Sequence, residues 1–314
     1  MELTDARALV TGGAGFIGSH LVDALVDRDV RVRVLDDFSS GTRDNLLDAD
    51  ADTGVDVIEG DVRDADDLDT AMAGVDVVFH EAAVVDVTES VDDPLGTHEI
   101  NATGGLNVLD AARRADARVV IASSAAVYGH PERVPIAESD PTRPTSPYGL
   151  QKLALDRYAT LYHELYGLET VALRYFNVYG PRSAGGPYAG VIDVFRDQAG
   201  EGRPITVDGD GTQTRDFVHV DDVVRANLLA ATTDAVGEAY NVGRGEATSI
   251  RDLAERVREA VGSDSEIVHT DPRPGDVDHS TADLTKARER LGYEPTVSLE
   301  EGLADLVRRS GESS

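Results

Sequence analysis

The sequence predicts an α/β fold in which a doubly wound parallel sheet carries a second, smaller mixed α/β domain. Short runs of β-branched residues alternate with longer stretches of helical periodicity, an order typical of a parallel sheet with helices on both faces. After about residue 175 this alternation loosens, and Gly and Pro become frequent. We therefore assign residues 1–175 plus 218–245 to the first domain and residues 176–217 plus 246–314 to the second.

The elements of the first domain follow from these runs. We expect strands at 6–11, 30–35, 55–59, 75–79, 117–122, 170–174 and 240–242. Between them, helical patterns lie near 16–27, 64–73, 99–115, 148–166 and 221–231. The connections between parallel strands should be right-handed crossovers. A second domain placed over the edge of such a sheet makes a cleft, which is the usual place for a ligand.

The composition excludes several classes of partner. The chain of 314 residues has 59 acidic and 29 basic side chains, a net charge of −30, yet 41% of it is hydrophobic, which is enough for a core. A field this negative repels phosphate backbones and anionic membrane surfaces, so we expect no nucleic-acid or membrane partner. The spread of acids suggests a halophilic cytoplasm, a hypothesis that unfolding measured against KCl concentration would test.

Missing residue types narrow the chemistry further. The chain has no Cys, which excludes disulfides, thiolate catalysis and zinc–thiolate sites. The eight His show no tight metal-binding spacing, and we expect no metal site. The sequence contains no apolar run long enough to span a membrane, and its first residues lack the pattern of a signal peptide. These observations favour a cytoplasmic protein.

A glycine-rich turn follows the first predicted strand, with Gly12, Gly15 and Gly18 three residues apart. Glycine permits the tight turn and lets the backbone at the start of the next helix approach a pyrophosphate. The second strand ends in Asp36 and Asp37, where a carboxylate can accept both ribose hydroxyls of an adenosine but repels a 2′-phosphate. The combination predicts NAD in preference to NADP. The alternative is a tight turn followed by acids in a chain already rich in Asp.

Three residues form a candidate catalytic group. Tyr148 and Lys152 are four residues apart on one predicted helix and therefore share a face. A nearby ammonium favours the phenolate, which lowers the pKa of a tyrosine from its usual value of about 10. Ser124 lies at the end of the fifth predicted strand, where it is placed to hydrogen-bond a reacting hydroxyl. Together these groups would take a proton from an alcohol while a hydride leaves its carbon.

The scarcity of lysine makes this spacing informative. The chain has 27 Arg but only two Lys, Lys152 and Lys286. A guanidinium cannot copy the compact ammonium of lysine, so a lysine kept at position 152 indicates a specific role. The alternative is an ordinary lysine on the surface of a helix, which is the interpretation we favour for Lys286 because no motif surrounds it.

The motifs together resemble the extended short-chain dehydrogenase/reductase family, in its NAD-dependent nucleotide-sugar epimerase/dehydratase branch. The resemblance covers nearly the whole chain and implies a Rossmann-type first domain. It is carried by TGGAGFIG at 11–18, the aspartate pair, GDV at 60–62, HEAA at 80–83, Asn101, SSAAVYG at 123–129, YGLQK at 148–152, RYFN at 174–177, TRDFVHVDD at 214–222 and PRPGD at 272–276. One departure is Glu81, where the family more often has an apolar residue.

The resemblance implies a role for each matching residue. Tyr148 would be the base, Lys152 its partner and Ser124 the residue that binds the hydroxyl. The NAD site would comprise Gly12, Gly15, Phe16, Ile17, Gly18, Asp36, Asp37, Asp61, Val62, Ala82, Ala83, Tyr148, Lys152 and Tyr175. The substrate, a nucleoside-diphosphate sugar, would be contacted by Ser124, Tyr148, Asn177, Arg215 and Arg273. The guanidinium groups of the two arginines suit phosphate oxygens, although ion pairs within the protein are an alternative.

Two alanines favour one reaction within this branch. Its dehydratases and decarboxylases usually carry an acid between the active serine or threonine and the Val-Tyr pair, whereas this chain has Ala125 and Ala126 there. The minimal machinery that remains implies epimerisation at C4 of a sugar of the UDP-glucose/UDP-galactose type, through a transient 4-keto intermediate. A 4,6-dehydratase that takes its acid from elsewhere, a 4-keto-sugar reductase or dehydrogenase, and a non-catalytic NAD-binding regulator remain alternatives.

The predicted helix at 148–166 has two apolar faces. One face includes Leu150, Leu161 and Leu165, and the other includes Leu155 and Ala159. One face can cover the sheet, while the other needs a second cover. The family commonly pairs such helices between subunits, so the resemblance implies a homodimer. Burial of this second face under the chain's own smaller domain is the alternative.

Overall fold

The computed structural model describes residues 3–49, 54–183, 190–273 and 275–312. Residues 184–189 of the second predicted domain and Pro274 of the PRPGD motif lie outside the described residues. No helix in the described ranges is long and apolar enough to cross a membrane.

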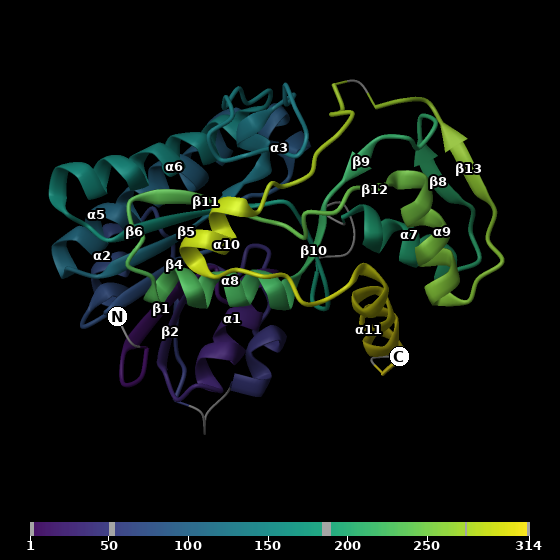
Figure 1. Ribbon diagram of the computed structural model, residues 1–314. Helices are drawn as coiled ribbons and strands as arrows, with labels where there is room; N and C mark the ends of the chain where they lie inside the picture. Colours follow the sequence, from purple (N-terminus) through teal and green to yellow (C-terminus); the bar gives the residue numbers. More distant parts are fainter. Residues whose placement is uncertain (1–2, 50–53, 184–189, 274, 313–314) are drawn as a thin grey trace.

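Seven parallel strands form the central sheet, in the order β11-β6-β5-β4-β1-β2-β3 (Figure 1). Their bounds are Arg7–Thr11 (β1), Arg31–Asp36 (β2), Asp56–Glu59 (β3), Val77–His80 (β4), Arg118–Ser124 (β5), Thr170–Tyr175 (β6) and Glu238–Val242 (β11). Each neighbouring pair in this order is parallel. The seven predicted strands are all present, so the predicted fold class is confirmed.

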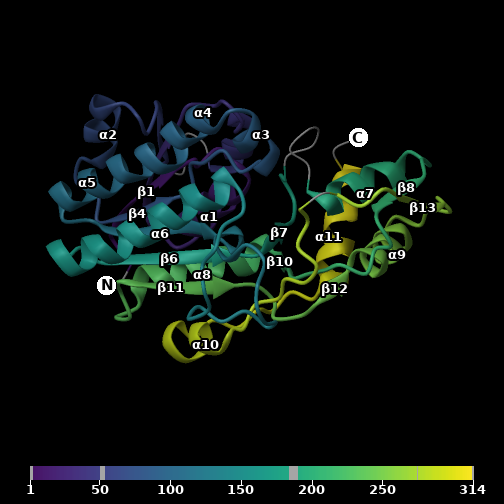
Figure 2. The ribbon, with the colours of Figure 1, turned by 90° about the horizontal axis from the view of Figure 1, so that it is seen from above.

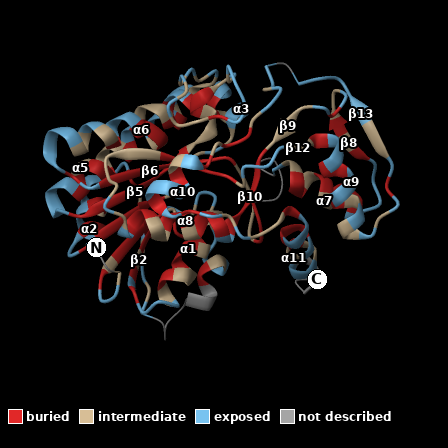
Figure 3. Ribbon diagram, viewed as in Figure 1, coloured by how far each residue is buried: buried red, intermediate tan, exposed pale blue. Residues whose placement is uncertain are grey.

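Helices cover both faces of this sheet (Figure 2). One face packs against α1 (Phe16–Val26) and α8 (Val220–Thr232), and the other packs against α2 (Ala65–Met72), α5 (Gly105–Ala115) and α6 (Pro147–Tyr166). Apart from the edge strand β3, whose residues are exposed or half-buried, the strand residues are mostly buried, as the red ribbon in Figure 3 shows. Burial on both faces explains why inner strands such as β4 and β5 read as continuous apolar runs rather than as alternating patterns.

The predicted helix at 99–115 differs from expectation in its first part. The helical segment begins earlier, with α3 (Val87–Asp92) and α4 (Pro94–His98), and continues through a π-helical turn, η2 (Glu99–Gly104), into α5. A π turn holds one more residue than an α turn, and apolar periodicity does not reveal it. The turn carries Asn101 into the interior, where it is 1% exposed.

A smaller lobe lies beside the carboxyl end of the sheet (Figure 1). It contains α7 (Val191–Gly200), α9 (Ile250–Val261), α11 (Leu299–Glu312) and the parallel pair β8 (Ile205–Asp208) and β13 (Ile267–Thr270). These elements share a separate apolar core. Two short pairs lead into the lobe: β7 (Asn177–Tyr179) with β10 (Phe217–His219), and β9 (Thr214–Arg215) with β12 (Thr248–Ser249).

One helix late in the chain packs with the central sheet. In both ribbon views α10 (Thr285–Leu291) lies beside β11 (Figures 1 and 2). Its buried Ala287 and Leu291, with Tyr293 after it, belong to the apolar core of the sheet. The predicted domain boundaries stay a prediction, and this packing favours counting the segment from 282 to 293 with the sheet.

The order of the strands places the site. It reverses between β1 and β4, and in open parallel sheets ligands bind outside the carboxyl ends of strands at such a point. The glycine turn follows β1, and residues 81–83 follow β4, so both predicted cofactor segments meet there.

Candidate active site

The glycine turn and β4 approach each other closely. Gly12 has a φ of +69°, and a Cβ at this position would lie 2.6 Å from the backbone nitrogen of Ala82. A Cβ on Gly18 would overlap the carbonyl of Gly12. Helix α1 then begins at Phe16 after Gly15, which has no side chain to cap the first N–H groups of the helix. This cradle fits a pyrophosphate, because uncapped N–H groups at a helix start attract anions.

Asp36 ends β2 and is buried against the same turn. Its carboxylate accepts hydrogen bonds from the backbone N–H of Ala14 at 2.9 Å and of Phe38 at 2.9 Å. Burial raises the pKa of Asp36 above its usual value, although both hydrogen bonds act against that rise. The sequence indicated a ribose acceptor here, and the structure adds a second role, because Asp36 ties the glycine turn to β2.

The other predicted adenosine contacts lie at the ends of β2 and β3. Asp37 is exposed and accepts hydrogen bonds from the N–H and hydroxyl of Ser39, the latter at 2.6 Å. Asp61 forms an ion pair of 2.5 Å with Arg63, and this hydrogen-bonded guanidinium lowers the pKa of Asp61. Val62 is buried beside it. These positions are compatible with an adenine site, in which Arg63 is a neighbour that the sequence did not single out.

The π turn explains how Asn101 fixes the loop after β4. Its side-chain oxygen accepts from the N–H of Val84 at 2.8 Å, and its amide nitrogen donates to the carbonyl of Val84 at 2.9 Å. The same amide donates to Gln151 on α6 at 2.8 Å. Asn101 therefore holds the segment that contains Ala82 and Ala83 against the helix that carries Tyr148 and Lys152.

The three candidate catalytic residues come together at the end of β5. Tyr148 and Lys152 lie in the first part of α6, and the Lys152 ammonium is 5.9 Å from the centroid of the Tyr148 ring. Ser124 ends β5 and hydrogen-bonds the hydroxyl of Tyr148. Lys152 also donates to the carbonyl of Ala122 on β5 at 2.9 Å, which fixes the ammonium beside the strand.

The start of helix α6 is fixed by a serine cap, a proline and a contact with α3. Ser146 caps the helix by accepting from the N–H of Gly149, and Pro147 takes the first helical position. The N–H of Tyr148, which has no acceptor within the helix, donates to the Ser90 hydroxyl of α3 at 3.1 Å. Sequence reasoning missed Ser90, because no local pattern connects it with a tyrosine 58 residues later.

Burial dominates the electrostatics of this group. Lys152 is 3% exposed, and burial lowers its pKa to about 8, while the charge of Glu81 acts against that fall. Burial raises the pKa of Tyr148 above its usual value; the hydrogen bond from Ser124 opposes this rise and Glu81 adds to it. The phenol is thus protonated at neutral pH in the protein alone, and the predicted role as a base would depend on added positive charge.

Glu81, the departure from the family pattern, is part of a chain of hydrogen bonds. The hydroxyl of Tyr175, at the end of β6, donates to Glu81 at 2.9 Å. The Tyr175 oxygen in turn accepts from the side-chain amide of Asn227 on α8 at 2.8 Å. Burial raises the pKa of Glu81 to about 7, against the hydrogen bond from Tyr175 and the charge of Lys152.

A buried ion pair lies one helical turn beyond Lys152. Asp156 accepts from the guanidinium of Arg174 at 2.9 and 3.0 Å and from the hydroxyl of Ser123 at 3.1 Å. Both charged side chains are nearly inaccessible. The pair ties α6 to β5 and β6 at the residues directly before Ser124 and Tyr175. Sequence reasoning missed it, although the spacing of four from Lys152 to Asp156 placed both on one helical face.

The predicted diphosphate contacts lie in a different environment. Asn177 begins β7, and its amide donates to the carbonyl of Asp216 at 3.0 Å. Arg215 forms an ion pair of 2.5 Å with Asp276. Arg273 is 74% exposed and lies 3.5 Å from a carboxylate oxygen of Asp208. Both arginines are thus paired within the protein, as the alternative interpretation of these residues allowed.

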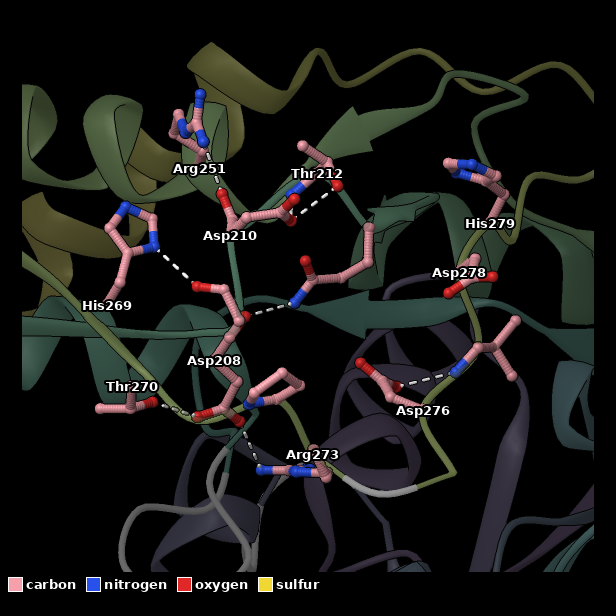
Figure 4. A pocket seen from close by; sticks show the side chains of 14 residues that line it. Asp208, Asp210, Thr212, Arg251, His269, Thr270, Arg273, Asp276, Asp278 and His279 are labelled. Atoms are coloured by element: carbon pink, nitrogen blue, oxygen red, sulfur yellow. Dashed lines mark hydrogen bonds and ion pairs between the residues drawn. The ribbon is translucent and has the colours of Figure 1, made fainter.

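An open cavity of about 750 Å³ lies between the end of β8 and the segment after β13 (Figure 4). Figure 4 shows Arg273 and Asp276 at one side of it, with Asp210, Arg251 and His269 at the other. Ser124, Tyr148 and Lys152 do not line this cavity. It borders the predicted diphosphate contact Arg273 but is separate from the predicted catalytic group.

Comparison with known proteins extends this picture. The model of a family described as the NAD dependent epimerase/dehydratase family matches residues 8–243. A UDP-glucose 4-epimerase from Mycolicibacterium smegmatis is 42% identical over 305 residues, which cover 96% of this chain and 97% of the relative.

Two solved structures are also similar over nearly the whole chain. One is a UDP-N-acetylglucosamine 4-epimerase from Methanobrevibacter ruminantium in complex with UDP-N-acetylmuramic acid, with a TM-score of 0.95, 38% identity and coverage of 99% of this chain and all of that one. Another is a UDP-glucose 4-epimerase from Thermotoga maritima with UDP-glucose, with a TM-score of 0.93, 38% identity and coverage of 98% and 99%. Other relatives are named decarboxylases and dehydratases.

Proposed function

Because the chain belongs to the NAD dependent epimerase/dehydratase family, we propose that it interconverts the C4 epimers of a nucleoside-diphosphate sugar of the UDP-glucose/UDP-galactose type. The observation that carries this proposal is the group formed by Ser124, Tyr148 and Lys152 at the end of β5, with apolar Ala125 and Ala126 directly after the serine.

NAD is the cofactor of this family, and when bound it supplies the acceptor and the donor of the hydride at the reacting carbon. The glycine cradle between Gly12 and Ala82 fits its pyrophosphate, and Asp36 fits its adenosine ribose. A carboxylate at this place repels a 2′-phosphate, which supports NAD over NADP.

The chain's own residues handle the proton. Ser124 would hydrogen-bond the C4 hydroxyl, and Tyr148 would remove its proton as the carbon is oxidised. The Lys152 ammonium, held at the carbonyl of Ala122, would favour the phenolate over the phenol. After the 4-keto sugar has turned its other face toward the cofactor, Tyr148 would return the proton to the C4 oxygen. No net acid or base is then consumed.

The substrate's diphosphate would be bound by Arg215 and Arg273, with Asn177 beside them. Guanidinium groups bind phosphate oxygens in two-point contacts, and these two arginines lie near the cavity of the smaller lobe. In a chain with a net charge of −30, such local positive groups are needed to overcome repulsion of an anionic ligand.

A dehydratase is the second candidate, and Glu81 is the observation that favours it. This acid interacts with Tyr148 and Lys152, although it lies at the end of β4 rather than after Ser124. Its hydrogen bond from Tyr175 points to a fixed position rather than to an acid that reaches the sugar's C5 and C6. We therefore place the epimerase first.

The test follows both sugars by NMR without added NAD. Purified protein in high KCl should convert UDP-galactose into UDP-glucose and the reverse, because cofactor that stays bound is regenerated in each turnover. UDP-N-acetylglucosamine should be included, since one similar structure is named for that sugar. A 4-keto-6-deoxy sugar from UDP- or dTDP-glucose would replace the proposal with a dehydratase, and accumulation of free NADH with a dehydrogenase.

We also propose a homodimer built on α6. Leu155 and Ala159 are buried against the sheet, whereas Leu150, Leu161 and Leu165 are 59%, 41% and 62% exposed. An apolar stripe of this kind on a long helix favours a second copy as its cover. Light scattering in high salt should give twice the mass of the chain, and a monomer would contradict the proposal.

A further inference from the structure

Glu81 influences Tyr148 and Lys152 electrostatically, although it is not one of the three proposed catalytic residues. We propose that Glu81 is a positioning residue whose carboxylate, held by Tyr175, keeps the Lys152 ammonium protonated beside Tyr148. This inference rests on the proposed function, because it assigns Lys152 as the partner of the base. The inference assigns a role to Glu81, which takes no part in the glycine cradle or in the proposed proton transfer.

The topology of the sheet explains why Glu81 reaches Lys152. Strand β5 lies between β4 and β6, and neighbouring strands are about 4.8 Å apart, so the outer two are separated by about 10 Å. The hydrogen bond from Tyr175 at the end of β6 to Glu81 after β4 must therefore cross the end of β5. That end holds Ala122, whose carbonyl binds the Lys152 ammonium, and Ser124.

Contacts of its neighbours and of its carboxylate hold Glu81 in place. His80 directly before it is tied to Thr11 of β1, with 2.8 Å between the His80 Nδ1 and the Thr11 hydroxyl. Tyr175 donates to the carboxylate, and Asn227 of α8 donates to Tyr175. An acid held in this way keeps one position rather than moving freely.

The surrounding groups determine which charge Glu81 carries. Lys152 and Tyr148 face it from α6, Tyr175 faces it from β6, and His80 neighbours it on β4. Burial lowers the pKa of His80 to about 3, so this ring is neutral at physiological pH. Lys152 is thus the cation among these groups, and a negative Glu81 stabilises it while burial destabilises it.

The expected effect of removing the carboxylate has a defined sign. In Glu81→Gln the force that raises the pKa of Lys152 is lost, so Lys152 should lose its proton at a lower pH. The same change removes a charge that raises the pKa of Tyr148. Loss of the carboxylate thus lowers the pKa of both Lys152 and Tyr148, so the pH optimum of turnover should move to lower pH.

The scarcity of lysine allows a direct measurement. Protein labelled with ¹³C-lysine gives signals from two side chains, Lys152 and Lys286, which a Lys286→Arg variant assigns. In Glu81→Gln with its bound NAD, the Lys152 titration midpoint should fall by about one pH unit, the size expected for losing a nearby opposite charge. The Lys286 signal should stay where it is, and a merely structural role for Glu81 would not move Lys152 in this way.

Glu238→Gln is the matched control. Glu238 forms an ion pair of 2.9 Å with Lys286, which also donates to the carbonyl of Ala239. This variant should change the Lys286 signal and leave the Lys152 midpoint unaltered. An equal movement of Lys152 in both variants would mean that the effect comes from net charge, and would overturn the inference.

Tyr175→Phe keeps the proposal testable if Glu81→Gln does not fold. The carboxylate remains, but it loses the hydrogen bond that lowers its pKa, so it is protonated more readily. The Lys152 midpoint should then fall in the same direction by a smaller amount. A wild-type midpoint in both variants would overturn the role of Glu81, whereas wild-type protein that turns over no sugar would overturn the proposed function instead.

Discussion

The end of β5 and the cavity of the smaller lobe differ in how far their charged side chains are buried. At β5, Lys152 is 3% exposed and Asp156 and Arg174 form a nearly inaccessible pair, each with several hydrogen bonds. Around the cavity, Arg273 is 74% exposed and lies 3.5 Å from a carboxylate oxygen of Asp208. The first region is arranged in the protein alone, while in the second the two arginines of the proposed diphosphate site are paired with carboxylates, from which a ligand would have to release them. We infer that the chemistry is preorganised and that substrate binding involves exchange of ion pairs.

The strongest way to break this comparison is to remove the phenol. Tyr148→Phe should lower kcat by about a thousandfold, because general base catalysis contributes about 10²–10⁴ to the rate. Bound NAD, followed by its absorbance after denaturation, should be retained because the glycine cradle is untouched. Tyr158→Phe on the same helix, 38% exposed, is the control that should keep wild-type activity. Retained turnover in Tyr148→Phe would refute its assignment as the base.

The buried ion pair tests whether the first region is prearranged. Arg174→Met should lower the free energy of unfolding by about 3–5 kcal/mol, because the carboxylate of Asp156 would stay buried without its partner. Chemical denaturation measures this directly. In the control Arg203→Met, an exposed pair with Glu201 is lost, and such pairs contribute about 0–1 kcal/mol. Equal losses in both variants would show that the two regions do not differ as described.

The second region should respond in binding and not in chemistry. Arg215→Gln should raise KM by about 10–100-fold with little change in kcat, the size expected for losing a charge-assisted hydrogen bond to a diphosphate. Steady-state kinetics separate the two constants. Arg256→Gln, which breaks an exposed ion pair with Glu300, should leave KM unchanged. A fall confined to kcat would place Arg215 with the chemistry and contradict the comparison.

The smallest expected effect tests whether a ligand must release Arg273 from its ion pair with Asp208. In Asp208→Asn the exposed partner of Arg273 is lost, so KM should fall by about two- to threefold, since exposed ion pairs contribute about 0–1 kcal/mol. Asp278→Asn removes a negative charge from the same cavity without touching that pair. If both variants lower KM equally, overall charge rather than release of Arg273 explains the change.

The two regions also differ in how far the sequence predicts them. The inner strands were predictable because they are buried on both faces and read as apolar runs, as in 117–122 for β5. Tyr148 and Lys152 were predictable because one helical face and a lysine-poor chain single them out. Their association with Ser124 follows from a serine at a strand end, and the hydrogen bond to Tyr148 agrees with it.

What the sequence did not predict depends on contacts between distant segments. The bond from Ser90 to the N–H of Tyr148 and the chain from Asn227 through Tyr175 to Glu81 join residues that share no local pattern. The ion pairs of Arg215 and Arg273 also join segments that are distant in the sequence. The motifs predict phosphate binding by these arginines, while the structure alone shows which carboxylates hold them.

The π turn between α4 and α5 has a consequence for insertions and deletions. Its extra residue offsets the helix by about a quarter of a turn, so that Asn101 faces the loop after β4 while Val108 and Leu109 still face the sheet. Deleting one residue from 99–104 would restore a regular helix but rotate one of these two sets out of place. In this segment the number of residues is as constrained as their identity, and conservative substitutions should be tolerated where a single deletion is not.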